Sequence, residues 1–396
     1  MQPEIKVGKR LIVCFDGTWN NADDIGGDTN VARIARAIHA NIGTGGIPQV
    51  VLYLRGVGTT GMQADKVISG ATGLGVDDNI RSAYMFVAQN YLPGDEIYLF
   101  GFSRGAFTAR SVAGLIAAVG VLKRESLWAL GEAWKYYRSP KPHSPGKFLS
   151  SCPVSEAAQK PDTHQGAEIT FLGVWDTVGA LGIPFQMFDR INGQLYGFYD
   201  TGISPIVRNA YHALAIDEHR DSFVPTLWTG EPPPRCSVEQ VWFAGAHADV
   251  GGGYKSRRLA DIPLVWMASK AEGVGLVLDW TCLPDPATLD PLAPTHDSSN
   301  GLFALSHFVP TLREVCGRSF KVPLFQRLYR PTGPNHEELQ TIGEAIHSSA
   351  LERFGKDATV SGIDDAHLNL RAVYAPKNLQ PFFDADGKRR PETPVA

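Results

Sequence analysis

The sequence contains little cysteine and no excess charge of either sign. Five cysteines are scattered among 396 residues, and no two of them form a CxxC pair. An odd and dispersed set predicts neither a disulfide framework nor a zinc site. Lys and Arg number 37 against 41 Asp and Glu, which gives a formal net charge of −4. Because Lys and Arg are not in excess over Asp and Glu, the chain is not expected to bind nucleic acid.

Long hydrophobic runs are also missing. Near the N-terminus a short apolar run is interrupted at Asp16, so the segment lacks the apolar core and cleavage site of a secretory signal. No stretch of about 18 uncharged apolar residues suggests a membrane-spanning helix. We therefore expect a soluble protein that is made in the cytoplasm.

The sequence does contain an alternation of apolar strands and helical patterns. Continuous apolar runs, typical of strands covered on both faces, occupy residues 10–15, 49–54, 96–100, 168–175 and 238–243. Helical periodicity occupies residues 30–42, 77–91, 104–119 and 261–276. This order predicts an α/β fold of the hydrolase type, with a mainly parallel central sheet and helices on both faces. Active groups in such sheets collect at the carboxyl ends of the strands.

The domain organisation follows from the same patterns. We expect residues 1–280 to form an α/β-hydrolase catalytic domain, with insertions near 120–160 and 184–236 that make a helical cap. Residues 281–376 are expected to form a helical extension packed on that domain, with helices at 301–313 and 337–354. The last segment, 377–396, is expected to be a flexible tail.

The motif Gly101-Phe102-Ser103-Arg104-Gly105 lies between a predicted strand and a predicted helix. A G-x-S-x-G motif in this context is typical of a nucleophile elbow, in which the serine occupies a strained turn. We therefore predict Ser103 as a nucleophile. The backbone N–H of Arg104 is expected to face a developing oxyanion at the start of the helix.

A serine nucleophile needs a histidine base and an acid that orients the histidine. Asp176 and His247 each follow a predicted strand, and the chain order Ser103, Asp176, His247 is that of α/β-hydrolases. Asp249 is the alternative acid. His347 is the alternative base, because the histidine of this fold also comes late in the chain.

Further groups are expected at the same edge of the sheet. Gly17 and Thr18 follow the first strand and are candidates for the second oxyanion amide. A metal-dependent alternative would gather Asp16, Asp176, His247 and Asp249 around a hard cation, but it leaves the serine motif unexplained. We expect no metal and no organic cofactor.

Aromatic residues suggest how a substrate would be held. Phe102 lies beside the serine, and Phe185 and Phe188 belong to the aromatic insertion. Such side chains suit an apolar acyl channel, although packing beneath a surface insertion would use the same residues. An apolar channel would favour lipid esters over small soluble ones.

Read together, FDGTWN, GFSRG, GVWDTVG, DEHR and GAHADVGGGY resemble the catalytic domain of the type VI secretion phospholipase effectors, specifically their first lipase-effector family. The resemblance covers residues 10–276. It implies an α/β-hydrolase acting on phospholipid acyl esters, in which Ser103 matches the nucleophile, Asp176 the acid and His247 the base. It also implies export without a signal peptide, transient contact with a membrane surface, and a partner in the secretion machinery or an immunity protein.

The expected function is therefore a serine hydrolase of carboxylic esters, a phospholipase or lipase. Three alternatives remain at this point. They are a general carboxylesterase for small soluble esters, a metal-dependent hydrolase, and a catalytically inactive hydrolase fold that serves as a binding module.

Overall fold

The computed structural model describes residues 8–17, 27–40, 46–56, 74–139, 143–153, 159–179, 201–297, 310–322, 324–333, 337–361 and 370–396. Its centre is a seven-stranded sheet in the order β12-β8-β7-β6-β3-β1-β2, and every pairing in it is parallel. The strands are β1 (Arg10–Phe15), β2 (Gln49–Leu54), β3 (Glu96–Phe102), β6 (Ile169–Trp175), β7 (Asn209–Ala215), β8 (Ser237–Phe243) and β12 (Glu344–Ile346). The predicted α/β class with a mainly parallel sheet is confirmed.

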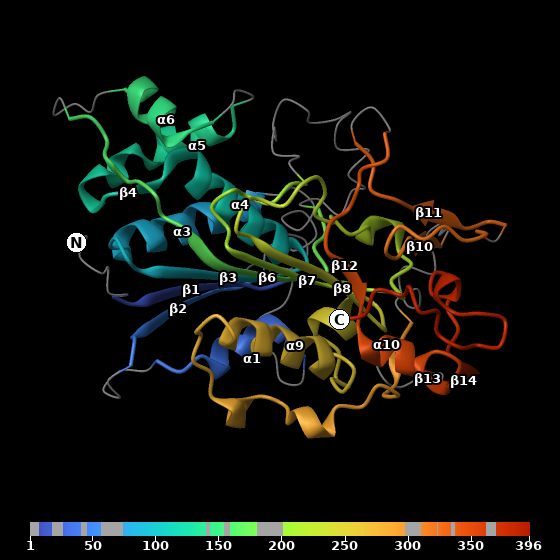
Figure 1. Ribbon diagram of the computed structural model, residues 1–396. Helices are drawn as coiled ribbons and strands as arrows, with labels where there is room; N and C mark the ends of the chain where they lie inside the picture. The colour runs from blue at the N-terminus through green and yellow to red at the C-terminus, as the bar shows by residue number, and fades with distance from the viewer. Residues whose placement is uncertain are drawn as a thin grey trace.

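Helices cover both faces of this sheet (Figure 1). On one face lie α3 (Leu74–Asn90), α4 (Arg104–Val119), α5 (Leu130–Tyr137) and α6 (Pro145–Ser151). On the other face lie α1 (Asn30–Ala37) and α9 (Asp261–Glu272). The short helices α8 (His247–Gly251) and α10 (Ser348–Arg353) each follow a strand of the sheet, β8 and β12 respectively.

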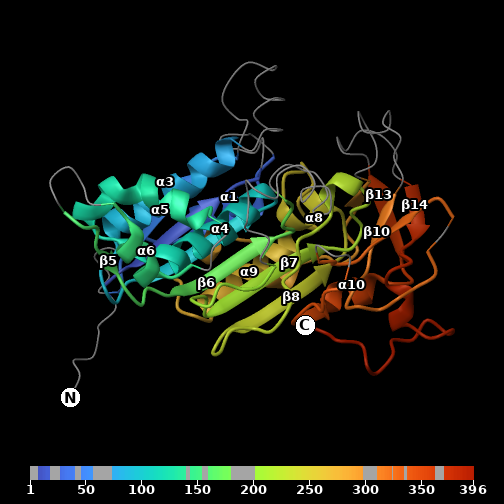
Figure 2. The same cartoon turned by 90° about the horizontal axis from the view of Figure 1, so that it is seen from above.

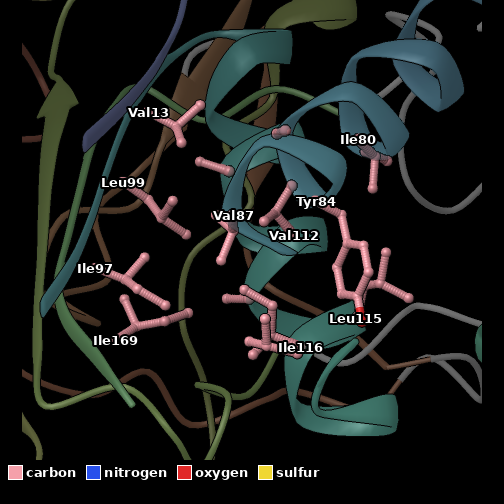
Figure 3. Packing of buried hydrophobic residues seen from close by; sticks show 14 of the residues in the cluster. Val13, Ile80, Tyr84, Val87, Ile97, Leu99, Val112, Leu115, Ile116 and Ile169 are labelled. Carbon is pink, nitrogen blue, oxygen red and sulfur yellow. The ribbon is translucent and has the colours of Figure 1, made fainter. Parts of the chain in front are cut away.

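The main core lies between the sheet and the pair α3 and α4 (Figure 3). Val13 and Leu99 from the strands meet Val87 and Val112 from the helices, and all four are fully buried. Complete burial of such a side chain contributes about 1.5 to 3 kcal/mol. A second apolar cluster fills the space between the sheet and α1 and α9. The strands are therefore apolar on both faces, as the continuous hydrophobic runs predict.

Several elements differ from the sequence-based expectation. Strand β7 lies inside the segment 184–236, which was expected to be a cap insertion; residues 184–200 of that segment lie outside the described residues. The predicted helix 337–354 is wrong in its first part, where β12 adds to the edge of the sheet, and only α10 is helical. The predicted helix 301–313 ends in strand β10 (Thr311–Arg313), while 301–309 lie outside the described residues.

In the described part of 281–376, the regular secondary structure consists mainly of short strands. Besides β10 and β12 it contains β9 (Thr295–His296), β11 (Arg327–Tyr329), β13 (Asp357–Ser361) and β14 (Leu370–Val373). Pairs β10-β11 and the set β14-β13-β9 form small separate sheets. Figure 2 places them beside the β8 side of the central sheet, away from α5 and α6.

The segment 377–396 is anchored to the fold near both of its ends, which corrects the expectation of a flexible tail. Phe382 is buried in an apolar cluster with Trp242 of β8. The amide of Ile346 donates to Pro394 O at 2.9 Å, so the end of the chain lies against β12. No helix among the described residues is long and apolar enough to cross a membrane.

Candidate active site

Ser103 occupies the turn between β3 and α4 in a strained backbone conformation. Its φ of 58° and ψ of −123° lie outside the regions that L-residues usually adopt. The turn is fixed from the neighbouring strand: Ser103 N donates to Trp175 O at 3.0 Å, and Val178 N donates to Ser103 O at 3.3 Å. The carboxyl ends of β3 and β6 therefore bring Ser103 and Asp176 to the same edge of the sheet.

The glycines on either side of the turn are required by close backbone contacts. A Cβ atom on Gly101 would lie 2.5 Å from Gly105 O, and one on Gly105 would lie 2.2 Å from Phe15 O. Neither distance is compatible with a side chain. The two glycines thus allow α4 to cross directly over the ends of β3 and β1.

His247 and Asp176 meet across the edge of the sheet. His247 is the first residue of α8 after β8, and its Nδ1 lies 2.5 Å from Asp176 Oδ2. Because the carboxylate accepts the hydrogen bond, Nδ1 carries the proton and Nε2 is left as the acceptor nitrogen. Burial lowers the pKa of His247, and hydrogen bonding and attraction from Asp176 only partly oppose this effect. The ring is thus neutral near pH 7.

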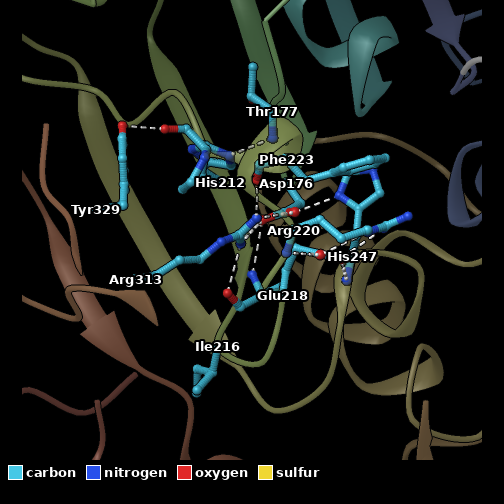
Figure 4. Close-up of polar contacts among 12 residues, drawn as sticks. Asp176, Thr177, His212, Ile216, Glu218, Arg220, Phe223, His247, Arg313 and Tyr329 are labelled. Atoms are coloured by element: carbon cyan, nitrogen blue, oxygen red, sulfur yellow. Dashed lines mark hydrogen bonds and ion pairs between the residues drawn. The ribbon is translucent and has the colours of Figure 1, made fainter. Parts of the chain in front are cut away.

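Asp176 is completely buried and accepts hydrogen bonds from other groups besides the imidazole (Figure 4). Arg313 donates from Nη1 to Oδ1 at 2.7 Å and from Nη2 to Oδ2 at 3.1 Å, and Ala215 N donates to Oδ1 at 3.1 Å. Burial alone would raise the pKa of Asp176, but Arg313 and His247 together hold it well below its usual range. The carboxylate is therefore charged at neutral pH.

Arg313 is a site residue that sequence reasoning missed. It is separated from Asp176 by 137 residues and closes the segment that was expected to be a helix. No local pattern around it indicates a contact with the acid. Only the fold brings it to this position.

The imidazole contacts two phenylalanine rings. The ring centroids of Phe102 and Phe223 lie 4.6 Å and 4.9 Å from that of His247. Phe102 was expected to touch substrate, but it is 2% exposed and its ring fills the space above Gly251. The structure therefore gives Phe102 a packing contact with the imidazole in place of an open binding surface.

A second buried ion pair lies on the backbone side of His247. Glu218 accepts the backbone N–H of His247 at 3.3 Å and pairs with Arg220 at 2.8 Å. The Arg220 guanidinium also lies over the Phe223 ring, 3.6 Å from its centroid. The Asp-Glu-His-Arg run that carries part of the family resemblance thus helps to fix the start of α8.

The turn after Asp176 rests on a buried, neutral histidine. Thr177 N donates to His212 Nε2 at 3.1 Å, and the other ring nitrogen lies 3.3 Å from Gln240 Oε1. Burial lowers the pKa of His212 to about 3, with a smaller contribution from Arg110. His212 therefore serves as a fixed acceptor for the backbone of this turn.

The alternative acid and base have other partners. Asp249 accepts from His296 Nδ1 at 2.6 Å and from Ala246 N at 3.0 Å. His347 stacks on Phe243 and caps α10, and burial lowers its pKa to about 4. The structure brings Asp176, and not Asp249, to the ring of His247.

The structure describes two of the three residues expected to donate to the oxyanion, Gly17 and Arg104. Gly17 N donates to Asp16 Oδ1 at 2.7 Å, so this amide faces its own neighbour and the expectation for Gly17 is not met. Thr18, Phe185 and Phe188 lie outside the described residues. Arg104 is the first residue of α4, at the end of the helix where the dipole favours negative charge.

The arrangement of the side chains does not support the metal-dependent alternative. Asp16 accepts from Thr29 Oγ1 at 2.9 Å, whereas Asp176 and Asp249 pair with different histidines. Within the part of the chain that the structure describes, no three His, Cys, Asp or Glu side chains come together in a way that could hold a metal ion.

The segments that form this edge of the sheet lie within the match to a known protein family. The model for "T6SS, Phospholipase effector Tle1-like, catalytic domain" matches residues 9–270, which is more than half of the chain. The chain belongs to this family. The matched residues include Ser103, Asp176 and His247, whereas Arg313 lies beyond them. The family expected from the sequence motifs is confirmed at the level of a Tle1-like phospholipase effector catalytic domain.

Individual relatives are longer than this chain. The uncharacterized protein YEL023C of Saccharomyces cerevisiae is 30% identical over an alignment of 247 residues, and the match covers 57% of this chain and 33% of that protein. An uncharacterized protein from Pseudomonas aeruginosa has a crystal structure with a TM-score of 0.42 and 19% identity, covering 72% of this chain and 49% of that one. The Tle1 effector bound to the VgrG spike gives a TM-score of 0.35 and 21% identity, covering 64% and 52%. The chain thus spans between a third and about half of these relatives.

Proposed function

We propose that the protein is a serine hydrolase that cleaves acyl esters of phospholipids, with Ser103 as nucleophile, His247 as base and Asp176 as orienting acid. The observation that carries the proposal is the 2.5 Å contact between His247 Nδ1 and Asp176 Oδ2, at the edge of the sheet where Ser103 occupies its strained turn. The lipid ester comes from the family, whose described function is that of a phospholipase effector. Export by a type VI secretion system belongs to the same proposal.

The chemistry follows from the roles of these groups. His247 Nε2 takes the proton of the Ser103 hydroxyl while Oγ attacks the ester carbonyl carbon. Asp176 fixes the tautomer and stabilises the imidazolium, and the N–H of Arg104 stabilises the negative oxygen of the tetrahedral intermediate. The protonated His247 then delivers its proton to the leaving alcohol. Water, deprotonated by the same nitrogen, releases the acyl group from Ser103.

Ser103→Ala tests the nucleophile, with Ser111→Ala as the matched control. Ser111 lies two turns further along α4, where its Oγ donates to Phe107 O at 2.9 Å. We expect Ser103→Ala to lower ester turnover by at least about 10³ without unfolding the protein, because the triad acts as a unit. Ser111→Ala should keep its activity. A fluorophosphonate probe should label Ser103 in the wild type and leave Ser103→Ala unlabelled.

The substrate class is tested with a panel of phospholipids, triglycerides and short soluble esters, with the products identified by mass. Long-chain phospholipids in vesicles should be cleaved faster than short soluble esters. Cleavage of short esters alone would leave a general carboxylesterase. A folded wild type that neither hydrolyses any ester nor reacts with the fluorophosphonate would contradict the whole proposal.

A further inference from the structure

The carboxylate of Asp176 faces a cation on the side away from His247. The Arg313 side chain is 1% exposed and forms two parallel hydrogen bonds with the two carboxylate oxygens, at 2.7 Å and 3.1 Å. A planar guanidinium in this arrangement fixes the plane of the carboxylate, which a single point contact would not do. Oδ2 is shared with His247 Nδ1, so the orientation of the carboxylate sets the orientation of the imidazole.

Arg313 itself forms hydrogen bonds with three other segments of the chain. Its Nη1 donates to Ala215 O at 2.7 Å and its Nη2 to Phe223 O at 2.6 Å. Its backbone carbonyl accepts from the buried Asn378 Nδ2 at 3.2 Å. The guanidinium is thus preorganised by the end of β7, by the segment that carries Phe223, and by the C-terminal segment.

The charges around His247 come in two opposite pairs. Asp176 pairs with Arg313, and Glu218 pairs with Arg220. Burial alone would raise the pKa of Glu218, but Arg220, with help from Arg313, holds it at about 2, so both carboxylates are charged. Arg313 and Arg110 both act electrostatically on His212, which is neutral, and on Tyr329, whose pKa burial raises above its usual range. Because Asp176 and Glu218 each already pair with an arginine, protonation of His247 adds net positive charge to this buried group.

We propose that Arg313 is a positioning residue for the general base: its fork aligns His247 through Asp176, and its charge opposes protonation of the imidazole in the free enzyme. This inference rests on the proposed triad. The family match ends at residue 270, so the positioning cation comes from the part of the chain that follows the matched domain. Alignment and charge are separable functions of one side chain, and two substitutions distinguish them.

Arg313→Met removes the charge and the fork, whereas Arg313→Lys keeps the charge and removes the fork. In Arg313→Met we expect a lower kcat and an acid limb of kcat/KM that moves to higher pH by about 0.5 to 1 unit, because Asp176 then stabilises the imidazolium without the opposing charge of Arg313. In Arg313→Lys we expect a lower kcat with the acid limb close to that of the wild type. The readout is the pH dependence of hydrolysis of a soluble chromogenic ester.

Arg353→Met is the matched control. Arg353 is also fully buried, but its Nη1 donates to the backbone carbonyls of Pro291 and Ala293, and Asp176 is not its partner. This variant should lose stability and keep the acid limb of the wild type. The rate of fluorophosphonate labelling at Ser103, followed against pH, gives the same limb for a variant with too little folded protein for steady-state assays.

The outcomes separate this inference from the proposed function. An acid limb in Arg313→Met that is unchanged or displaced to lower pH, with Ser103 still labelled, would overturn the role of Arg313 and leave the triad standing. Equal limb shifts in Arg313→Met and Arg313→Lys would overturn the charge argument. A folded wild type whose Ser103 is never labelled would remove both proposals together.

Discussion

Replacing Asp176 by Asn is the sharpest test of the acid. Asp176 accepts four hydrogen bonds, one from His247 Nδ1, two from Arg313 and one from Ala215 N. An amide has one oxygen, and its NH₂ group would confront a donor of Arg313 in either position. In the position of Oδ2 it would also confront His247 Nδ1. If the NH₂ group faces His247, the ring adopts the other tautomer and Nε2 can no longer accept the serine proton. We expect kcat to fall on the order of 10⁴.

The same substitution should also cost stability, because the Arg313 charge stays buried after its carboxylate is lost. Breaking one partner of a buried pair costs about 3 to 5 kcal/mol. Unfolding in urea measures the loss in the free energy of unfolding. The kcat on a soluble ester measures the loss of turnover. Both are measured on protein whose circular dichroism matches that of the wild type.

Asp249→Asn is the matched control, because Asp249 pairs with His296. It should destabilise the protein by about 1 to 3 kcal/mol through a buried hydrogen bond and keep most of its turnover. The reasoning is refuted if Asp249→Asn abolishes turnover while Asp176→Asn keeps it.

Two further predictions concern the elbow and the alternative base. Gly105→Ala should prevent folding or lower stability by several kcal/mol in urea unfolding, because its Cβ would lie 2.2 Å from Phe15 O. Gly131→Ala is at an exposed position of α5, where an added Cβ meets nothing within 4 Å, and should raise stability by about 0.5 to 1 kcal/mol. Equal effects of the two would contradict the close crossing of α4 over β1. His347→Ala should leave kcat unchanged and cost about 0.5 to 2 kcal/mol through the lost cap of α10, and a large loss of kcat in folded protein would instead support His347 as the base.

Some of the fold could be predicted because local sequence determines it. Strand β1 and helix α4 have the predicted limits, since an apolar run fixes the first and a periodic run that begins at the Gly-x-Ser-x-Gly turn fixes the second. The positions of Asp176 and His247 follow from the rule that parallel strands present their carboxyl ends at one edge. The contact between these two side chains is the consequence.

Other elements depend on neighbours that are distant in sequence. Strand β7 carries the buried His212 and lacks the continuous apolar character of the other strands; it is a strand because β6 and β8 pair with it on both sides. Strand β12 has three residues, and its pairing with β8 overrides the helical pattern that surrounds it. Such short segments take their conformation from tertiary contacts, which no local window of sequence contains.

The surroundings of the candidate acid show why the chain after residue 270 matters to the chemistry. Residues 9–270 supply Ser103, His247 and Asp176, but a core that ended there would leave the buried Asp176 carboxylate without Arg313. β10, which ends in Arg313, is held by Thr311 N, which donates to His219 O at 2.9 Å, and by Asn378 from the C-terminal segment. Because a buried carboxylate is stable only when it is paired, the later segments and the catalytic core are energetically one unit. Substitutions that destabilise the packing of the C-terminal segment should therefore first disturb the orientation of the Asp176 carboxylate.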